Sequence, residues 1–289
     1  MNRLALGTVQ FGLHYGIANL TGQVTQLAAK EMLELASRSG IDTLDTAIAY
    51  GESETCLGNV GIRRCKLITK LPPLPEKCPN VIDWIEEQVS ASLVRLGVTN
   101  IYGLLLHRPE QLLGSEGHAI YKGLQRLKNR GQVRKIGVSI YSPAELDALT
   151  KHFRFDLVQA PFSLLDRRML TSGWLQRLKN AKVEIHTRSA FLQGLLLMPE
   201  SEMPNRFLAW SSVWQKWHAW LEVSGVSALH ACLAYPLSFP EIDRVVVGAD
   251  STNQLAQIID AVKNCRALEF PDIHCEDEKL INPSNWAIE

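Results

Sequence analysis

The stretch VRKIGVSIYSPAELDALTKHFRFDLVQA, residues 133–160, holds a complete strand–helix–strand unit. It opens and closes with a short apolar run, at 133–138 and at 157–160. Between these runs, Ser142 followed by Pro143 predicts the start of a helix, because serine caps the first backbone N–H groups and proline suits the first turn. Two strands joined through a helix pair in parallel by a right-handed crossover. The stretch therefore predicts an α/β fold with a parallel sheet.

The same alternation recurs along the whole chain. Eight short runs rich in valine, isoleucine and leucine are expected to form strands, separated by amphipathic stretches that are expected to form helices. The expected strands are Leu4–Thr8, Thr43–Thr46, Lys66–Thr69, Ile101–Leu106, Val133–Val138, Leu157–Ala160, Val183–Thr187 and Arg244–Val247. The expected helices cover 25–39, 80–96, 117–130, 142–151, 166–180, 206–237 (as two helices) and 252–262. In the first of these helices, Thr25 is the expected cap and Leu27 belongs to the expected buried stripe.

Eight such units, each of roughly 30–35 residues, predict a single-domain (β/α)8 TIM barrel over residues 1–262. The alternative is a doubly wound open sheet, but no GxGxxG motif follows the first expected strand. A long, proline-rich loop at 198–210 follows the seventh strand, and the tail 263–289 is expected to add a loop and a short helix. No shift in composition divides the chain, so 1–289 is expected to be one domain.

Composition narrows the class of protein further. The 289 residues are 46% hydrophobic and carry a formal net charge of zero, which gives no electrostatic reason to expect binding to nucleic acid or to an anionic membrane. No apolar run is long enough to span a bilayer, and the first residues show no signal-peptide pattern. Six scattered cysteines without CxxC spacing predict reduced thiols and no metal site. The expectation is a cytoplasmic protein that acts on small molecules, with its oligomeric state left open.

Polar residues follow three neighbouring strands at the point where each one ends. The stretch GIDTLDTAIAYGESETCLG, residues 40–58, places Asp45 at a strand end and Tyr50 on the loop after it, while Lys70 and His107 end the next two strands. Each alone has an ordinary structural interpretation, as a turn cap, a surface lysine or a core histidine. Active sites of (β/α)8 barrels lie at the carboxyl ends of the strands, so the four together predict one catalytic cluster.

The four side chains also suit one kind of chemistry. The ammonium of Lys70 lowers the pKa of a nearby phenol, so we expect it to activate Tyr50 as an acid, with Asp45 holding the lysine in place. His107 is expected to donate a hydrogen bond to the same substrate oxygen as Tyr50. Two donors aimed at one oxygen suit a carbonyl that is becoming an alkoxide, and a nicotinamide is the simplest source of hydride.

These motifs resemble the aldo-keto reductase family along nearly the whole chain. The resemblance is carried by LALGTVQFG, GIDTLDTAIAYGESETCLG, ITKL, LLLHRPE, GLQRLKNRGQVRKIGVS, VQAPFSLLDRR, FLQGLLL and VVVGADSTNQL. It implies that Asp45, Tyr50, Lys70 and His107 form the catalytic tetrad, with Tyr50 as the proton donor. It also implies that NADP(H) binds in an extended pose across the barrel mouth.

The resemblance implies cofactor-binding residues one position at a time. Gly7 and Thr8 match the segment near the nicotinamide, Ser139 and Gln159 match the residues that bind its carboxamide, and Gln254 matches a glutamine on the adenosine side. Gly194 lies in the stretch that lines the pyrophosphate. The remaining matched positions are Asp45, Arg188, Ser189, Phe191, Gly248, Ala249 and Ser251, the last three at the start of the final helix, whose amides can bind phosphate.

Several residues depart from the family pattern. Ile140 stands where the family usually has an asparagine that contacts the carboxamide, and Gln257 with Ile258 stands where a Glu-Asn pair is usual near the adenine. Arg188 replaces an aromatic residue that stacks on the nicotinamide; it is expected to pair either with cofactor phosphates or with an anionic substrate. The resemblance implies NADP(H) as the family default. The negative charge of Asp250 would oppose the 2′-phosphate of NADP(H), so NAD(H) stays open as the cofactor.

The resulting expectation is a reductase of small aldehydes, ketones or sugars, or an alcohol dehydrogenase in the reverse direction. His14, Tyr15, Arg108 and Trp210 are the candidate substrate residues. The stretch HTRSAFLQGLLL resembles a branch of the family associated with bacterial carbohydrate biosynthesis. Two alternatives stay open. One is a family member that binds a nucleotide or a partner with little or no turnover, and the other is a barrel with unrelated chemistry, such as an isomerase.

Overall fold

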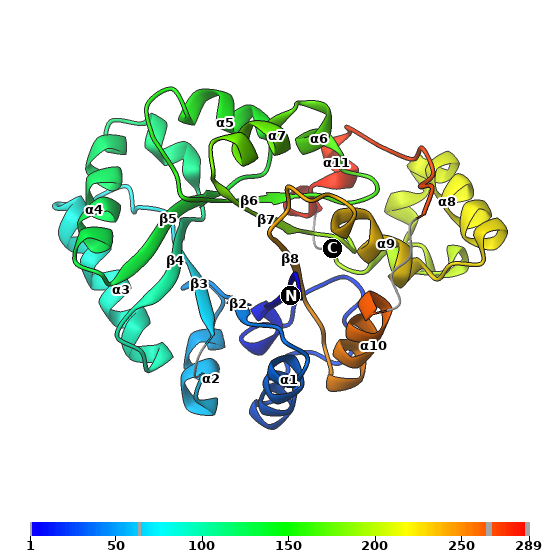
Figure 1. Ribbon diagram of the computed structural model, residues 1–289, viewed down its shortest axis with the longest axis horizontal. Coiled ribbons are helices and arrows are strands. Elements are labelled where there is room, and N and C mark those ends of the chain that lie inside the picture. The colour runs from blue at the N-terminus through cyan, green and yellow to red at the C-terminus, as the bar shows by residue number, and fades with distance from the viewer. Residues whose placement is uncertain (1, 63–64, 264–267, 287–289) are drawn as a thin grey trace.

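The structure, a computed structural model, describes residues 2–62, 65–263 and 268–286, and its eight parallel strands close into a barrel in sequence order (Figure 1). The predicted (β/α)8 TIM barrel is therefore confirmed. The strands are β1 (Leu4–Gly7), β2 (Thr43–Asp45), β3 (Lys66–Leu71), β4 (Ile101–Leu106), β5 (Val133–Ser139), β6 (Leu157–Pro161), β7 (Glu184–Arg188) and β8 (Arg244–Val247). Each lies within two residues of its expected bounds at either end.

Helices surround the barrel on its outer side (Figure 1). They are α1 (Gln26–Arg38), α2 (Ser53–Val60), α3 (Val81–Leu96), α4 (Gly117–Asn129), α5 (Pro143–Leu149), α6 (Arg168–Thr171), α7 (Trp174–Asn180), α8 (Ser211–Ser224), α9 (Ala228–Leu237), α10 (Thr252–Lys263) and α11 (Glu278–Ile281). Short 3-10 helices lie at Val9–Phe11, Pro109–Leu113, Leu195–Leu197, Glu200–Glu202, Asn205–Trp210 and Pro283–Asn285.

The caps read from the sequence lie where they were expected. The side chain of Thr25 accepts from the backbone N–H of Ala28 at the start of α1. Ser142 caps α5 within a full capping box, in which the carboxylate of Glu145 accepts from the Ser142 backbone N–H at 2.7 Å. These bonds satisfy amide groups that have no partner inside the helix.

Three sequence expectations about the helices were wrong. The helix expected over 166–180 is two helices, α6 and α7, because Gly173 takes the left-handed conformation with φ of 73°. Helix α2 was missed altogether; it has only eight residues and buries polar side chains, so it shows no apolar stripe. Leu27 is 70% exposed and does not belong to the buried stripe of α1.

The barrel interior is filled by side chains, which confines ligand access to its ends. Ile68, Leu105 and Leu157 form a small apolar cluster of buried residues, with Tyr102 packed against it. The phenol of Tyr102, near the start of β4, donates to Glu184 at 2.7 Å, and Lys135 also pairs with Glu184. These polar groups belong to the amino-terminal halves of their strands, so the opposite end of the barrel is left for chemistry.

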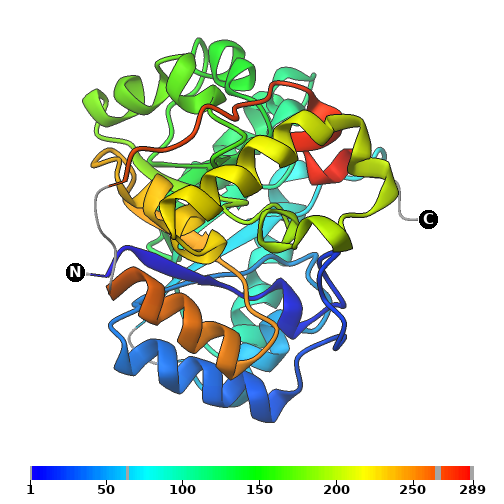
Figure 2. The same ribbon diagram turned by 90° about the vertical axis from the view of Figure 1, so that its right-hand side faces the viewer.

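Two segments beyond the repeating units pack together beside the barrel mouth. The predicted loop after β7 forms short 3-10 turns, and the predicted tail contributes α11 and runs alongside α8 (Figure 2). Trp286 of the tail packs edge-on against Phe207 of the loop, with ring centroids 4.9 Å apart. Trp210 donates from its indole N–H to Asp277 at 3.2 Å. The loop and the tail therefore support each other.

Candidate active site

Asp45 and Lys70 form a buried ion pair at the carboxyl ends of β2 and β3. The Nζ atom of Lys70 lies 2.6 Å from Oδ1 of Asp45 and also donates to the backbone carbonyl of Thr46 at 2.9 Å. The other carboxylate oxygen, Oδ2, accepts from Nε2 of Gln159 at 2.7 Å. Since both charges are buried, each depends on the other to offset the free energy lost on leaving water.

Tyr50 and His107 complete a compact cluster around this pair. The Nζ atom of Lys70 lies 5.2 Å from the centroid of the Tyr50 ring. The imidazole of His107 meets the same ring nearly edge-on, with centroids 5.8 Å apart and an angle of 77° between the planes. The structure thus brings together the four residues that the sequence singled out as a catalytic cluster.

The electrostatics of Tyr50 differ from the sequence expectation. Burial raises the pKa of Tyr50 above its ordinary value of 10.0, and the charge of Lys70 lowers it by less than burial raises it. The expectation that Lys70 brings this pKa below its usual value was therefore wrong, because the sequence does not reveal how strongly the phenol is desolvated. Tyr50 is consequently a neutral phenol near pH 7, which is the form that donates a proton.

Lys70 and His107 respond to the same surroundings in opposite ways. Burial lowers the pKa of Lys70, but the charge and hydrogen bond of Asp45, together with the neighbouring Tyr50, raise it by more, so the amine stays an ammonium. Burial, together with the charges of Lys70 and Arg188, lowers the pKa of His107 from 6.5 to about 4. His107 is therefore a neutral imidazole near pH 7 and keeps one ring N–H to donate.

We expect the imidazole of His107 to titrate near pH 4 rather than near 6.5. The unfolded chain binds this proton between those two pH values and the folded chain does not, so His107 makes the protein less stable as the pH falls through that window. Proton NMR of the histidine ring resonances over pH 3–8 tests this, with His107→Gln used for assignment. A resonance that disappears in His107→Gln but titrates near 6.5 in the parent protein would contradict the account.

Residues on β1, β5 and β6 hold the cluster from behind. The hydroxyl of Ser139 donates to Oε1 of Gln159 at 3.3 Å, which links it through Gln159 to Asp45. Thr8 is fully buried and donates its hydroxyl to the backbone carbonyl of Asp45 at 3.0 Å. Gly7 leaves no spare room, because a Cβ there would lie 3.2 Å from Val246. These predicted cofactor residues are thus also supports of Asp45.

Sequence reasoning assigned no role to the residues that fix the Tyr50 loop. Ser53, three residues after Tyr50, donates to the backbone carbonyl of Thr8 at 2.7 Å. Glu54 is buried and accepts from Thr69 at 2.7 Å and from Arg95 at 2.7 and 2.9 Å. The sequence did contain a clue to this role, because Ser53 and Glu54 are polar residues that closely follow Tyr50 in the quoted motif. Their bonds anchor α2 and so position the phenol.

The loops after β1 and β7 meet across the mouth. The side chain of Gln193 donates to the phenol oxygen of Tyr15 at 3.1 Å. Gly194 has φ of 93°, and a Cβ there would lie 2.4 Å from the Cβ of Ala18. Ser189 also has a positive φ, of 65°, so this segment holds a strained backbone at the site. Phe191, expected to bind cofactor, is half-buried and packs against the core.

Acceptor atoms gather between β8 and α10. The side-chain oxygen of Ser251 accepts from the backbone N–H of Gln254 at 3.2 Å, so Ser251 caps α10, and Gly248 and Ala249 precede the helix. Oε1 of Gln254 accepts from the backbone N–H of Asp250 at 2.8 Å. Burial raises the pKa of Asp250, against hydrogen bonds from Gln254 and Gln10 that lower it. The amide oxygen of Gln10 is buried with no partner among the described residues.

The four candidate substrate residues are not all placed at the cluster. Nε2 of His14 contacts the backbone carbonyl of Asn19 at 3.0 Å, so this ring folds back onto its own loop. Tyr15 is held by Gln193 and Trp210 by the tail. Arg108, directly after His107, is exposed and lies 5.8 Å from the centroid of the Tyr141 ring. Of the four, Arg108 is the one that directly follows a residue of the cluster, His107, in the sequence.

Comparisons with known proteins agree with this geometry. A family model described as "Aldo/keto reductase family" matches residues 3–272, and the chain belongs to that family. An uncharacterized oxidoreductase of Bacillus subtilis, YqkF, is 27% identical over 299 residues, which covers 94% of each chain. The NADH-specific methylglyoxal reductase of Escherichia coli is 27% identical over 220 residues, or 68% of this chain and 65% of that protein.

Solved structures share the fold. An aldo-keto reductase from Bacillus halodurans in its holo form has a TM-score of 0.72 and 22% identity, covering 92% of this chain and 88% of that one. The family is one of oxidoreductases that use nicotinamide cofactors and act on small carbonyl compounds. No helix among the described residues is long and apolar enough to cross a membrane. Within the same residues, no group of three or more His, Cys, Asp or Glu side chains could hold a metal ion.

Proposed function

We propose that this protein reduces the carbonyl of a small aldehyde, ketone or sugar to an alcohol with a nicotinamide cofactor, or catalyses the reverse oxidation. The observation that carries the proposal is the neutral phenol of Tyr50 beside the buried Asp45–Lys70 pair and the neutral imidazole of His107. A phenol near pH 7 is a poor acid unless the phenolate that it leaves behind is stabilised. Lys70 supplies that stabilisation at close range.

Each residue of the cluster has a distinct role in this proposal. Tyr50 gives its proton to the substrate oxygen, and the ammonium of Lys70 stabilises the phenolate that results. Asp45 keeps Lys70 charged and oriented, since the two bond at 2.6 Å. His107 donates a ring N–H to the same substrate oxygen. When bound, the reduced nicotinamide supplies the hydride.

The residues present fit a dinucleotide along the mouth. Gly194 lies in the loop after β7, and Gly248 lies just ahead of α10, whose amino-terminal amides can bind phosphate. The buried amide oxygen of Gln10, which has no partner in the described part of the chain, lies close to Gly248: a Cβ on Gly248 would be 2.5 Å from Nε2 of Gln10 and 3.0 Å from its oxygen. Ser139, Gln159, Ser189 and Phe191 are proposed to hold the nicotinamide end.

We expect this protein to bind NADH more tightly than NADPH, although the family default suggested NADP(H). Asp250 and the free oxygen of Gln10 are both acceptors, suited to ribose hydroxyls and opposed to a 2′-phosphate. A like charge at close range costs about 1 kcal/mol or more, which predicts a preference of roughly fivefold or more. Titration of tryptophan fluorescence with each cofactor measures it, and Asp250→Asn is expected to narrow the gap. Tighter binding of NADPH to the parent protein would contradict this assignment.

Turnover itself is tested by adding a panel of aldehydes, ketones and sugars to protein loaded with the preferred cofactor. The absorbance of the reduced cofactor is expected to fall with at least one carbonyl compound. Absence of binding by both NADH and NADPH would overturn the proposal. Cofactor binding without turnover of any carbonyl would favour the alternative of a nucleotide-binding protein.

A further inference from the structure

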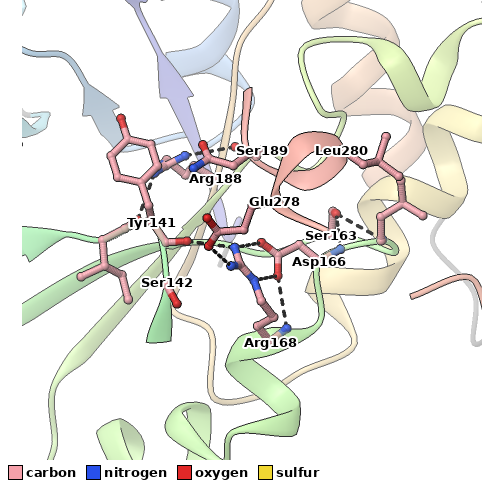
Figure 3. Close-up of polar contacts among 12 residues, drawn as sticks. Tyr141, Ser142, Ser163, Asp166, Arg168, Arg188, Ser189, Glu278 and Leu280 are labelled. Atoms are coloured by element: carbon pink, nitrogen blue, oxygen red, sulfur yellow. Dashed lines mark hydrogen bonds and ion pairs between the residues drawn. The ribbon is translucent and has the colours of Figure 1, made fainter. Parts of the chain in front are cut away.

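Arg188 is a cation at the mouth of the barrel whose hydrogen bonds all go to neutral groups. Its Nη2 donates to the backbone carbonyl of Ile140 at 3.0 Å, and its Nη1 donates to the hydroxyl of Ser189 at 3.3 Å. The guanidinium carbon lies 4.6 Å from the centroid of the Tyr141 ring (Figure 3). Among residues 2–62, 65–263 and 268–286, no carboxylate lies within 4.0 Å of this guanidinium.

The Tyr141 ring, on which Arg188 stacks, belongs to a residue whose backbone is held by two hydrogen bonds. The N–H of Tyr141 donates to Oε1 of Glu145 at 2.7 Å, and its carbonyl accepts from Nη2 of Arg168 at 2.9 Å. Arg168 in turn lies between Asp166, which is buried and 2.8 Å away, and Glu278 of the tail, which is 3.0 Å away (Figure 3). Arg188 is therefore held in a preorganised position, so little side-chain entropy remains to be lost when a ligand binds.

The two arginines beside Tyr141 contrast in their charge balance. Arg168 bonds two carboxylates and is neutralised by them. Arg188 has none, and the nearby carboxylate of Glu145 is already bonded to two backbone N–H groups. Arg108, on the β4 loop, also faces the Tyr141 ring and has only a loose contact of 4.0 Å with Glu110, in which both side chains are largely exposed. Among the described residues, the Tyr141 ring is thus bordered by Arg188, which has no close carboxylate, and by Arg108, which has only the loose contact with Glu110.

This excess charge lies next to the catalytic cluster. The charge of Arg188 contributes to lowering the pKa of His107 and acts against the rise in the pKa of Tyr50, so its field reaches both proposed proton donors. Its contacts are with the ends of β5 and β7, and Arg108 follows β4. Arg188 ends β7, which pairs with β8, but its guanidinium reaches past β6 to the carbonyl of Ile140 and the ring of Tyr141 after β5. It therefore extends away from β8, Gly248 and α10, where the phosphate-binding backbone is proposed. The position of Arg188 therefore suits the substrate side rather than the cofactor's phosphates.

We propose that Arg188, stacked on Tyr141 and assisted by Arg108, binds a carboxylate or phosphate group carried by the carbonyl substrate. The inference rests on the proposed carbonyl reduction for its setting and adds the substrate class, an anionic aldehyde, ketone or sugar. A guanidinium forms paired hydrogen bonds with either anion, and the flat Tyr141 ring beneath it leaves its outer edge for that ligand.

The preference for an anionic substrate is measured by comparing kcat/KM for pairs of substrates that differ in charge. 4-Carboxybenzaldehyde is compared with its neutral methyl ester, and D-glyceraldehyde 3-phosphate with D-glyceraldehyde. A charge-assisted bond to one guanidinium predicts kcat/KM about 10- to 100-fold higher for the anionic member of at least one pair. Arg188→Gln is expected to reduce that ratio to about one through KM, and Arg188→Lys to restore part of it. Arg108→Gln is expected to have a smaller effect in the same direction.

Arg177→Gln is the matched control, since Arg177 also stacks on an aromatic ring, 3.6 Å from the centroid of Trp174, but lies on α7. Arg177→Gln is expected to leave the ratio of kcat/KM between the charged and the neutral substrate unchanged in both pairs. Equal kcat/KM for charged and neutral substrates in the parent protein would overturn the inference. A loss of NADH affinity in Arg188→Gln with the ratio unchanged would also overturn it, because it would place the anion on the cofactor.

A binding measurement separates this inference from the proposed function. With oxidised cofactor no aldehyde can be reduced, so tryptophan fluorescence reports binding of 4-carboxybenzaldehyde and its ester alone. Tighter binding of the acid, lost in Arg188→Gln, would support the anion site even if no carbonyl were turned over. Turnover without any preference for the acid in either measurement would leave carbonyl reduction standing and overturn the anion site.

Discussion

Replacing Tyr50 with phenylalanine is expected to lower kcat by about 10²- to 10⁴-fold, the usual contribution of a positioned general acid. The hydroxyl is the only atom removed, and the ring contacts with His107 and Lys70 do not require it. The fold and cofactor affinity should therefore be unchanged. The measurement is kcat for the best carbonyl substrate, alongside a titration with NADH.

Two outcomes would count against the role of Tyr50. Turnover that survives in Tyr50→Phe would remove it as the proton donor. A matching loss of NADH affinity would mean that the phenol contributes to cofactor binding rather than to chemistry. Tyr15→Phe is the matched control, because it also removes a phenol oxygen at the mouth, one that accepts a hydrogen bond from Gln193, and it should retain most activity.

The second large effect is expected from Lys70→Met. This change leaves the carboxylate of Asp45 buried beside an apolar side chain, and breaking a buried pair from one side costs about 3–5 kcal/mol. The free energy of unfolding should fall by that amount, and kcat should fall because the phenolate of Tyr50 loses its cation. The free energy of unfolding is measured by denaturant unfolding followed by tryptophan fluorescence, and kcat is measured with the best carbonyl substrate.

The double variant Asp45→Asn with Lys70→Met is the diagnostic control for this prediction. It removes both charges, so it should recover part of the stability lost in Lys70→Met while remaining inactive. The exposed pair Arg38–Glu34, at 4.0 Å, gives the comparison: Arg38→Gln should change stability by less than about 1 kcal/mol. Equal stability of Lys70→Met and the parent protein would show that the pair does not carry the charge balance described above.

The barrel and the meeting of Asp45, Tyr50, Lys70 and His107 were predictable because both depend on local features of the sequence. Apolar runs marked each strand, and polar residues at consecutive strand ends had to meet once the strands were parallel. The register confirms this geometry, since Asp45 pairs with Ile68, two residues before Lys70. Helix α2 was missed because its short segment buries Ser53 and Glu54, whose partners lie on other elements.

What the sequence left open depends on contacts between distant segments. The desolvation that raises the pKa of Tyr50 arises only in the folded chain, so the direction of the pKa shift could not be predicted from the presence of Lys70 alone. The link from Glu278 through Arg168 to Tyr141 joins the tail to β5 across more than a hundred residues. Whether Arg188 had a carboxylate partner was equally a question for the folded chain.

The central claim, hydride transfer to a carbonyl carbon assisted by Tyr50, is tested most directly by isotope transfer. NADH carrying deuterium at the transferable position of its nicotinamide is incubated with the protein and its best carbonyl substrate, and the product alcohol is examined by mass spectrometry and NMR. The account predicts one deuterium on the former carbonyl carbon, and far less product with Tyr50→Phe. Product alcohol without deuterium at that carbon would contradict it.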